Sequence, residues 1–295
     1  MNEENTETKP DNDATPDSVS RVVGRVLRVL VACEYSGVVR EAFTELGHNA
    51  TSCDLLNSDR PGKHYQGDVM DIINDGWDMM ICHPPCTYLS VSGIHWNDRG
   101  RGWDETYKAL EFVRNLLDAN IPIIALENPV SIISSRIRKP NQIIHPHQFG
   151  HDASKKTCLW LKNLPNLIGN HDIKPRIADG KKRWGNQTDS GQNNLPPSKD
   201  RWKIRSTTYK GIAQAMAEQW SAHALSLLTN AQNANAVESL GALFAWSATQ
   251  SANVSGQPMP KKRDGNSEKK ERKPAVAESN PPGNVSVIMR AMSGR

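Results

Sequence analysis

The sequence predicts an α/β fold in which helices cover both faces of a doubly wound, mostly parallel sheet, as in Rossmann-like domains. Two observations support this fold class. Between Arg28 and Leu228, short apolar runs alternate with longer segments of helical periodicity, which is the pattern of a parallel sheet with covering helices. Each apolar run also leads into a polar residue, as expected where strands carry a ligand site at their carboxyl ends.

The elements follow in order along the chain. Residues 29–32 (VLVA) predict a first buried strand, the turn 33–37 follows it, and a helix over 38–46 ends at Gly47. Asp104 caps a helix whose apolar residues share one face, and the last helix covers 211–228. The other predicted strands are residues 50–53, 65–67, 77–82, 121–126 and 158–161.

The two ends of the chain differ in composition from the middle. Residues 1–20 are acidic and polar, and residues 229–295 are rich in Ala, Asn, Ser, Gly and Pro, with a basic run. We expect both ends to be disordered, because such sequences bury too little apolar surface to fold. One apolar island, 238–248, fits a docking helix and an inert stub equally well. The predicted folded domain is therefore 21–228.

The composition excludes some classes of protein. No run approaches the roughly 20 apolar residues of a membrane span, and the acidic N-terminus lacks the features of a signal peptide. The five cysteines are an odd number, which favours reduced thiols. A net charge of +4 is compatible with a nucleic-acid partner without requiring one. We therefore expect a cytoplasmic protein with no membrane contact.

Cys86 is the candidate nucleophile. It follows Pro84 and Pro85 beyond the predicted strand, and prolines fix the backbone, so the thiol would be held in one direction. A cysteine beside an apolar run is more commonly a small core residue, and for Cys82, inside the strand, we adopt that interpretation. Cys86 lies past the strand in a more polar setting, which reactive thiols need.

Glu127 follows the next apolar strand, and Asn128-Pro129 is expected to break that strand. A carboxylate here is costly to bury unless it meets water, a partner or a substrate, and a helix cap or surface carboxylate is the simpler alternative. On the strand after the Cys86 loop, Glu127 could hydrogen-bond to or protonate a ring nitrogen of a base that the thiol attacks. Cys86 and Glu127 thus form a candidate catalytic pair.

The first strand-to-helix turn is the candidate cofactor site. It contains one glycine rather than the three of a dinucleotide fingerprint, which favours a smaller cofactor. Asp54 ends the second strand, where an acid commonly binds ribose hydroxyls, and Asp68, after the third strand, could contact an adenine edge. Taken singly, each acid also fits a turn or cap role. The candidate cofactor residues are Cys33, Glu34, Ser36, Gly37, Asp54 and Asp68.

The sequence predicts no metal site. Its two groups of histidine and cysteine are Cys82, His83, Cys86 and His95, and His145, His147 and His151. The first group lacks the second ligand pair that structural zinc requires, and histidines in a loop, such as the second group, are usually solvated.

Together these motifs resemble the cytosine-C5 DNA methyltransferase family, in particular its short phage-type members. The resemblance covers about residues 28–220 and depends most on Pro85-Cys86 followed by Glu127-Asn128. It implies an S-adenosylmethionine-dependent methyltransferase domain that needs no metal. In such a domain Cys86 attacks the cytosine ring, Glu127 contacts N3, and the early turn and the two acids hold the cofactor. The implied substrate-binding residues are Pro85, Asn128 and Lys156.

The chain departs from the family pattern in two strands and in the recognition segment. The family's Gln-x-Arg-x-Arg strand is replaced by Lys155-Lys156-Thr157, and Glu-Asn-Val appears as Glu-Asn-Pro. The segment available for DNA recognition is a small insertion, about 163–206, with basic residues beside tryptophan at 181–184 and 201–203. Such pairs suit phosphate contact and base stacking, and a solvated loop pinned by two tryptophans is the alternative. Residues 211–213 resemble the family's closing motif, which returns to the cofactor pocket.

The function that follows from the resemblance is methyl transfer from S-adenosylmethionine to carbon 5 of cytosine in DNA. The expected setting is a bacterial or phage-infected host cell, with the protein acting as a monomer on DNA and giving protection against restriction. Two alternatives stay open. The short recognition segment also fits an enzyme that uses Cys86 on a pyrimidine mononucleotide. The altered strand at Lys155-Lys156-Thr157 and the basic tail also fit a non-catalytic DNA-binding protein on the same fold.

Overall fold

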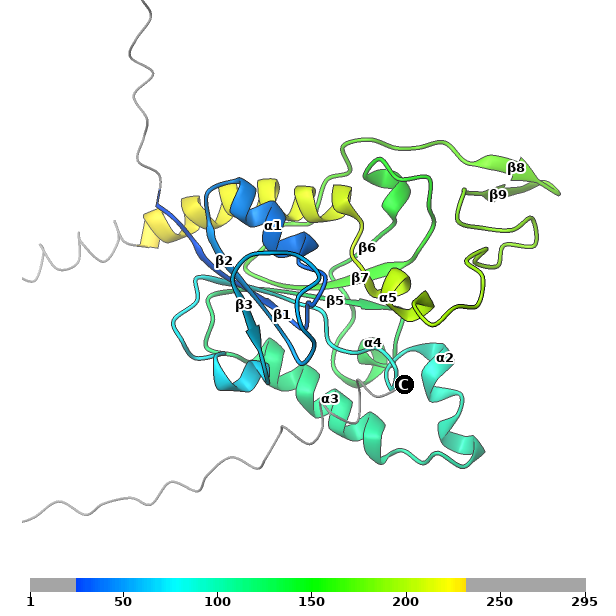
Figure 1. Ribbon diagram of the computed structural model, residues 1–295, viewed down its shortest axis with the longest axis horizontal. Helices are drawn as coiled ribbons and strands as arrows, with labels where there is room; N and C mark the ends of the chain where they lie inside the picture. The colour runs from blue at the N-terminus through cyan, green and yellow to red at the C-terminus, as the bar shows by residue number, and fades with distance from the viewer. Residues whose placement is uncertain (1–24, 232–295) are drawn as a thin grey trace, which may run out of the picture.

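The computed structural model describes residues 25–231, and its centre is a seven-stranded sheet (Figure 1). The strands run in the order β3-β2-β1-β4-β5-β7-β6. Neighbouring strands from β3 to β5 are parallel, and β7 is antiparallel to both β5 and β6. The predicted mostly parallel, Rossmann-like sheet is confirmed. The predicted segment 1–20 and the 238–248 island lie outside the described residues.

The sheet strands are β1 (Arg28–Ala32), β2 (Asn49–Asp54), β3 (His64–Gln66), β4 (Met79–Cys82), β5 (Ile123–Pro129), β6 (Gln142–Ile144) and β7 (Thr157–Lys162). The helices are α1 (Val38–Glu45), α2 (Val91–Ile94), α3 (Asp104–Leu117), α4 (Ile133–Arg136) and α5 (Arg201–Ser206), and residues 210–231 are also helical. Short 3-10 turns are η1 (Val69–Asp71), η2 (Asn97–Arg99) and η3 (Pro146–Gln148). None of the helices within 25–231 has the length and apolar character to cross a membrane.

Helices cover both faces of the sheet, as a doubly wound fold requires. Along β1, Val29 and Val31 belong to the core beneath α1 and the 210–231 helix, whereas Leu30 and Ala32 belong to the core beneath α3. This division follows from the strand geometry, because successive side chains point to opposite faces. Figure 1 shows α1 and the last helix on one side of the sheet and α3 on the other.

The strand order creates a switch point beside β1. The chain passes from β1 to β2 and β3 on one side, then crosses back to place β4 and β5 on the other side. In open α/β sheets, ligands bind outside the carboxyl ends of the strands at such a point. The turn 33–37 leaves β1 there, and the loop that carries Cys86 leaves β4 beside it.

β5 is longer than the sequence predicts. The expectation that Asn128-Pro129 ends the strand is wrong, because β5 continues to Pro129, which pairs with Thr157 of β7. β7 supplies an antiparallel partner at this position, and a proline is tolerated where the ladder does not need its missing N–H. Glu127 therefore lies within a strand, with its neighbours held on both sides.

The insertion 163–206 contains elements too short to be recognised by periodicity. The insertion contains a hairpin of β8 (Arg176–Ala178) and β9 (Lys181–Arg183). Helix α5 lies at the end of the insertion. The three-residue strand β6 also escaped prediction, since a period of two needs four or more residues to be visible. Figure 1 shows the hairpin projecting beyond the end of the central sheet.

Candidate active site

The structure brings Cys86 and Glu127 to the same edge of the sheet. Cys82, the last residue of β4, pairs with Leu126 of β5, so the residues that follow these two positions emerge side by side. The side-chain amide of Asn128 donates a hydrogen bond of 2.8 Å to the Pro84 carbonyl. This bond ties the proline loop to β5. Cys86 is solvent-exposed, whereas Cys82 is buried in the strand, as the sequence predicts.

The Cys86 thiol is protonated in the resting site. Although Cys86 as a whole residue is exposed, nearby protein atoms partly desolvate its thiol, which raises the pKa of Cys86 above its ordinary value of 9.0, and the negative charge of Glu127 raises the pKa further. Lys155 and Arg205 lower the pKa but do not outweigh the first two effects. Because the thiolate is the nucleophilic form, attack by Cys86 requires a base that takes its proton.

Glu127 is ionised and held in one orientation. Its side chain is 12% exposed, and its Oε2 accepts a hydrogen bond of 3.0 Å from Nδ1 of His83. Burial by itself would raise the pKa of Glu127, but the hydrogen bond from His83 and the charge of Lys155 lower it below the ordinary value of 4.5. In the sequence, His83 stands out only as a member of a group of histidines and cysteines, and no local pattern reveals its pairing with Glu127.

Lys155 is the cation next to Glu127. A hollow of about 10 Å³ beside the carboxylate is lined by Lys155, Thr157, Thr208, Tyr209 and Ile212. Lys156, the predicted substrate contact, is exposed, and its charge acts on His145 and Cys158 instead. Alternation along extended backbone explains why Lys155 and Thr157 share this side and Lys156 does not. Ile212 of the 211–213 segment therefore lines the same hollow as Glu127.

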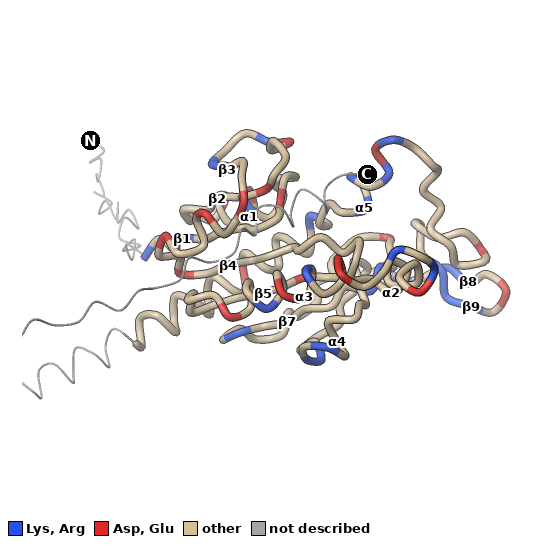
Figure 2. Tube along the Cα trace, turned by 90° about the horizontal axis from the view of Figure 1, so that it is seen from below, with Lys and Arg blue, Asp and Glu red and all other residues tan. Residues whose placement is uncertain are grey.

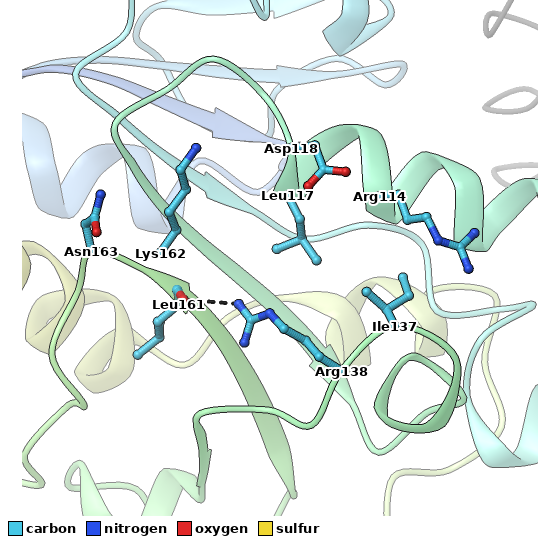
Figure 3. A pocket seen from close by; sticks show the side chains of 8 residues that line it. All are labelled: Arg114, Leu117, Asp118, Ile137, Arg138, Leu161, Lys162 and Asn163. Atoms are coloured by element: carbon cyan, nitrogen blue, oxygen red, sulfur yellow. Dashed lines mark hydrogen bonds between the residues drawn. The ribbon is translucent and has the colours of Figure 1, made fainter.

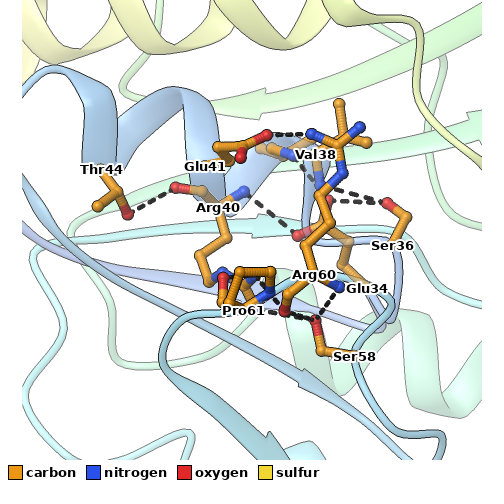
Figure 4. Close-up of polar contacts among 10 residues, drawn as sticks. Glu34, Ser36, Val38, Arg40, Glu41, Thr44, Ser58, Arg60 and Pro61 are labelled. Carbon is orange, nitrogen blue, oxygen red and sulfur yellow. Dashed lines mark hydrogen bonds and ion pairs between the residues drawn. The ribbon is translucent and has the colours of Figure 1, made fainter.

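Glu34 and Ser36 organise the candidate cofactor turn. The Glu34 carboxylate is buried and accepts hydrogen bonds from the backbone N–H of Val39 at 2.7 Å and from the Ser36 hydroxyl at 3.1 Å (Figure 4). A carboxylate at this position satisfies N–H groups at the start of α1 and complements the helix dipole. Cys33 and Gly37 both have left-handed backbone, with φ values of 59° and 70°. The turn is therefore sharp and tightly bonded.

Asp54 and Asp68 lie at the same edge of the sheet as this turn. Asp54 ends β2, where burial raises the pKa of its carboxyl group, and one oxygen accepts a bond of 3.0 Å from the Leu56 N–H. Asp68 is buried and caps η1 through a bond of 3.0 Å from the Met70 N–H. Each acid thus has the cap or turn role that the sequence allowed. Asp54 is only partly buried, so this edge fits a cofactor that offers hydroxyl or amine donors.

Two further observations concern metal binding and a second hollow. Among residues 25–231, no group of three or more His, Cys, Asp or Glu side chains is arranged to hold a metal ion. A larger hollow of about 640 Å³, lined by Arg114, Arg138, Lys162 and others, lies elsewhere (Figure 3). Lys162 pairs with Ile124 near the start of β5, which places this hollow at the opposite edge of the sheet from Cys86.

Comparisons with known proteins identify no family. No family model matches the sequence, and no curated protein matches it. Among solved structures, the chain is similar to the Entamoeba histolytica methyltransferase EhMeth, with a TM-score of 0.37 and 13% identity over 51% of this chain and 58% of that chain. It is also similar to WbdD, which was co-crystallised with the kinase inhibitor LY294002, with a TM-score of 0.28 and 16% identity over 55% of this chain and 41% of that chain. The matches thus span less than two thirds of either structure.

Proposed function

We propose that this protein transfers a methyl group from S-adenosylmethionine to carbon 5 of cytosine in DNA. The observation that carries the proposal is the exposed thiol of Cys86 beside the ionised carboxylate of Glu127, at the switch point of the sheet. Carbon 5 of cytosine is a poor nucleophile until a thiolate adds at carbon 6 and makes the ring electron-rich. A cysteine in the loop after β4 and a carboxylate on the adjacent strand β5 are the two groups that this activation needs.

Each residue has a defined part in this chemistry. The sulfur of Cys86 bonds to carbon 6, and the ring nitrogen N3 takes a proton from solvent as electron density moves onto it. Glu127, being ionised, accepts the hydrogen bond from this N3–H and stabilises it. With the methyl group on carbon 5, solvent accepts the carbon 5 proton, the carbon–sulfur bond breaks with its electron pair going to Cys86, and N3 returns its proton, which restores the aromatic ring. The cysteine is regenerated, as catalysis requires.

The turn 33–37, Asp54 and Asp68 would hold the cofactor at the neighbouring strand ends. When bound there, S-adenosylmethionine supplies an electrophilic methyl group on a sulfonium. Asp54 is placed to accept hydrogen bonds from ribose hydroxyls, the role that an acid at the end of the second strand has in dinucleotide-binding folds. Gly37 has a φ of 70°, which favours glycine and makes the turn sharp, and the side chain of Arg40 packs against it.

The β8–β9 hairpin supports DNA as the substrate. Arg176 pairs with Arg183, and both bind Asp189 through its carboxylate or its carbonyl, so these two arginines hold the neighbouring loop. The next pair, Ile177 and Lys182, lies on the opposite face of the ribbon, and both are exposed. Figure 2 shows that Lys and Arg run along the hairpin. A basic two-stranded ribbon has the dimensions to enter a major groove and contact phosphates.

The decisive experiment is to incubate the purified protein with labelled S-adenosylmethionine and unmethylated DNA and to identify the labelled nucleoside. We expect label in 5-methylcytosine, no product from Cys86→Ser, and normal product from Thr87→Ser, an exposed neighbour. Cofactor binding should persist in Cys86→Ser, because the thiol lies in the loop after β4 rather than in the cofactor turn. If a parallel incubation with dCMP in place of DNA is labelled and the DNA is not, the substrate is a mononucleotide. Turnover by Cys86→Ser would refute the nucleophile assignment.

A further inference from the structure

His83 is a polar residue of the site that the proposed mechanism does not use. It directly follows β4 and precedes Cys86 by three residues. Its Nδ1 lies 3.0 Å from Oε2 of Glu127, and each of these side chains is 12% exposed. Because an ionised carboxylate can only accept hydrogen bonds, the proton between them belongs to Nδ1 of His83. In the neutral imidazole the lone pair is therefore on Nε2.

Nε2 of His83 is buried, and within residues 25–231 it has no hydrogen-bond partner. A buried acceptor without a partner is unfavourable, and such groups in native proteins need a reason such as catalysis. The unpartnered atom belongs to an imidazole that Glu127 already orients. A carboxylate that holds Nδ1–H and leaves Nε2 available is the arrangement of the base in nucleophilic triads.

The thiol of Cys86 must lose its proton before it can attack. This thiol is protonated at rest, and the negative charge of Glu127 raises its pKa. The same carboxylate binds His83. The other charged groups that act on this thiol are Lys155 and Arg205. Both cations favour the thiolate of Cys86, and Glu127 holds the His83 imidazole through Nδ1.

We propose that His83 is the general base that deprotonates Cys86, with Glu127 as its positioning partner. The S–H bond of Cys86 breaks, its proton bonds to Nε2 of His83, and the electron pair stays on sulfur as the thiolate. The electron pair of the thiolate then forms the bond to carbon 6 of the substrate. This second step rests on the proposed function. When the sulfur leaves the ring, it regains a proton from Nε2. Cys86 and His83 therefore both end the cycle in their starting protonation states.

Alkylation of Cys86 by iodoacetamide tests this proposal without DNA or cofactor. The rate is followed by peptide mass spectrometry from about pH 5 to about pH 9, which covers the ordinary titration of imidazole and thiol. We expect His83→Gln to slow labelling of Cys86 at neutral pH by at least about ten-fold, since general bases contribute this much or more. His95→Gln, an exposed control in the same region, should match the wild type.

The buried thiols report on folding in the same experiment. Cys82 and Cys158 should stay unlabelled in each variant that keeps the fold. If His83→Gln exposes them, Glu127→Gln provides the second test. Removing the charge of Glu127 favours the thiolate directly, so faster labelling in Glu127→Gln means simple electrostatics and overturns the proposal. Slower labelling supports it, because His83 has lost the carboxylate that orients it.

The outcomes separate this proposal from the proposed function. Equal labelling of wild type and His83→Gln at every pH would show that His83 is not the base. DNA methylation by His83→Gln at the wild-type rate would lead to the same conclusion while leaving the methyltransferase function intact. Labelling that depends on His83, with no methylation of DNA, would instead support the base and refute the substrate.

Discussion

Arg40 allows a quantitative test of how the cofactor turn is supported. It is 2% exposed, and its guanidinium donates to Ser58 Oγ at 3.0 Å, to the Arg60 carbonyl at 3.0 Å and to the Pro61 carbonyl at 2.8 Å (Figure 4). This loop is joined to the turn by a bond of 2.8 Å from the Asp59 N–H to the Tyr35 carbonyl. Arg40 therefore supports the turn through the loop that it binds.

Arg40→Met keeps the apolar stem but removes every donor. Ser58 can still donate to the Arg60 carbonyl, at 2.8 Å, whereas the Pro61 carbonyl loses its guanidinium donor. Each buried group left without a partner costs about 1–3 kcal/mol, and the loss of a charged hydrogen bond lies at the upper end of this range. We therefore expect the free energy of unfolding to fall by about 2–4 kcal/mol. The affinity for the cofactor should fall as well, because the turn loses its support.

Urea denaturation measures the first effect, with the slope m unchanged if only stability is altered. The matched control is Arg114→Met, since Arg114 is exposed and makes one long bond of 3.4 Å to the Arg136 carbonyl. We expect this control to change the free energy of unfolding by less than about 0.5 kcal/mol. A loss below about 1 kcal/mol for Arg40→Met would show that the network contributes little.

Three further predictions follow from the same structure. Gly37→Ala should lower the melting temperature more than Gly47→Ala. Both glycines have positive φ, but only at Gly37 would the new Cβ meet a side-chain atom, at 2.6 Å from Arg40. Equal losses would show that contact with Arg40 does not matter. Glu127 stabilises the fold above its ordinary pKa of 4.5, and this stability is lost as the pH falls through its lowered folded-state pKa; Glu127→Gln should therefore flatten the acid side of the stability profile measured in urea. Lys182→Gln should reduce the slope of log affinity for DNA against log salt by about one, measured by fluorescence anisotropy; an unchanged slope would remove Lys182 from the interface.

Part of the candidate site could be predicted because it depends on strand ends. In a parallel sheet, every strand delivers its carboxyl end to the same edge, so Cys86, Glu127 and the turn 33–37 could be grouped from apolar runs alone. The sequence predicts Glu127 at the end of its strand, whereas the structure has it inside. The reason is that the partner strand β7 begins only at Thr157, well after β5 ends at Pro129. Antiparallel pairing over that distance has no local signature.

The sequence by itself determined the fold class, and it predicted the edge of the sheet for the candidate site and Cys86 and Glu127 as its candidate residues. These follow from hydrophobic periodicity and from polar residues at strand ends, which are local properties. Only the tertiary structure decided that His83 binds Glu127, that Lys155 rather than Lys156 faces the carboxylate, and that Asn128 holds the Pro84 carbonyl. Each of these depends on side-chain direction between segments distant in sequence, which is set only when the strands pack together.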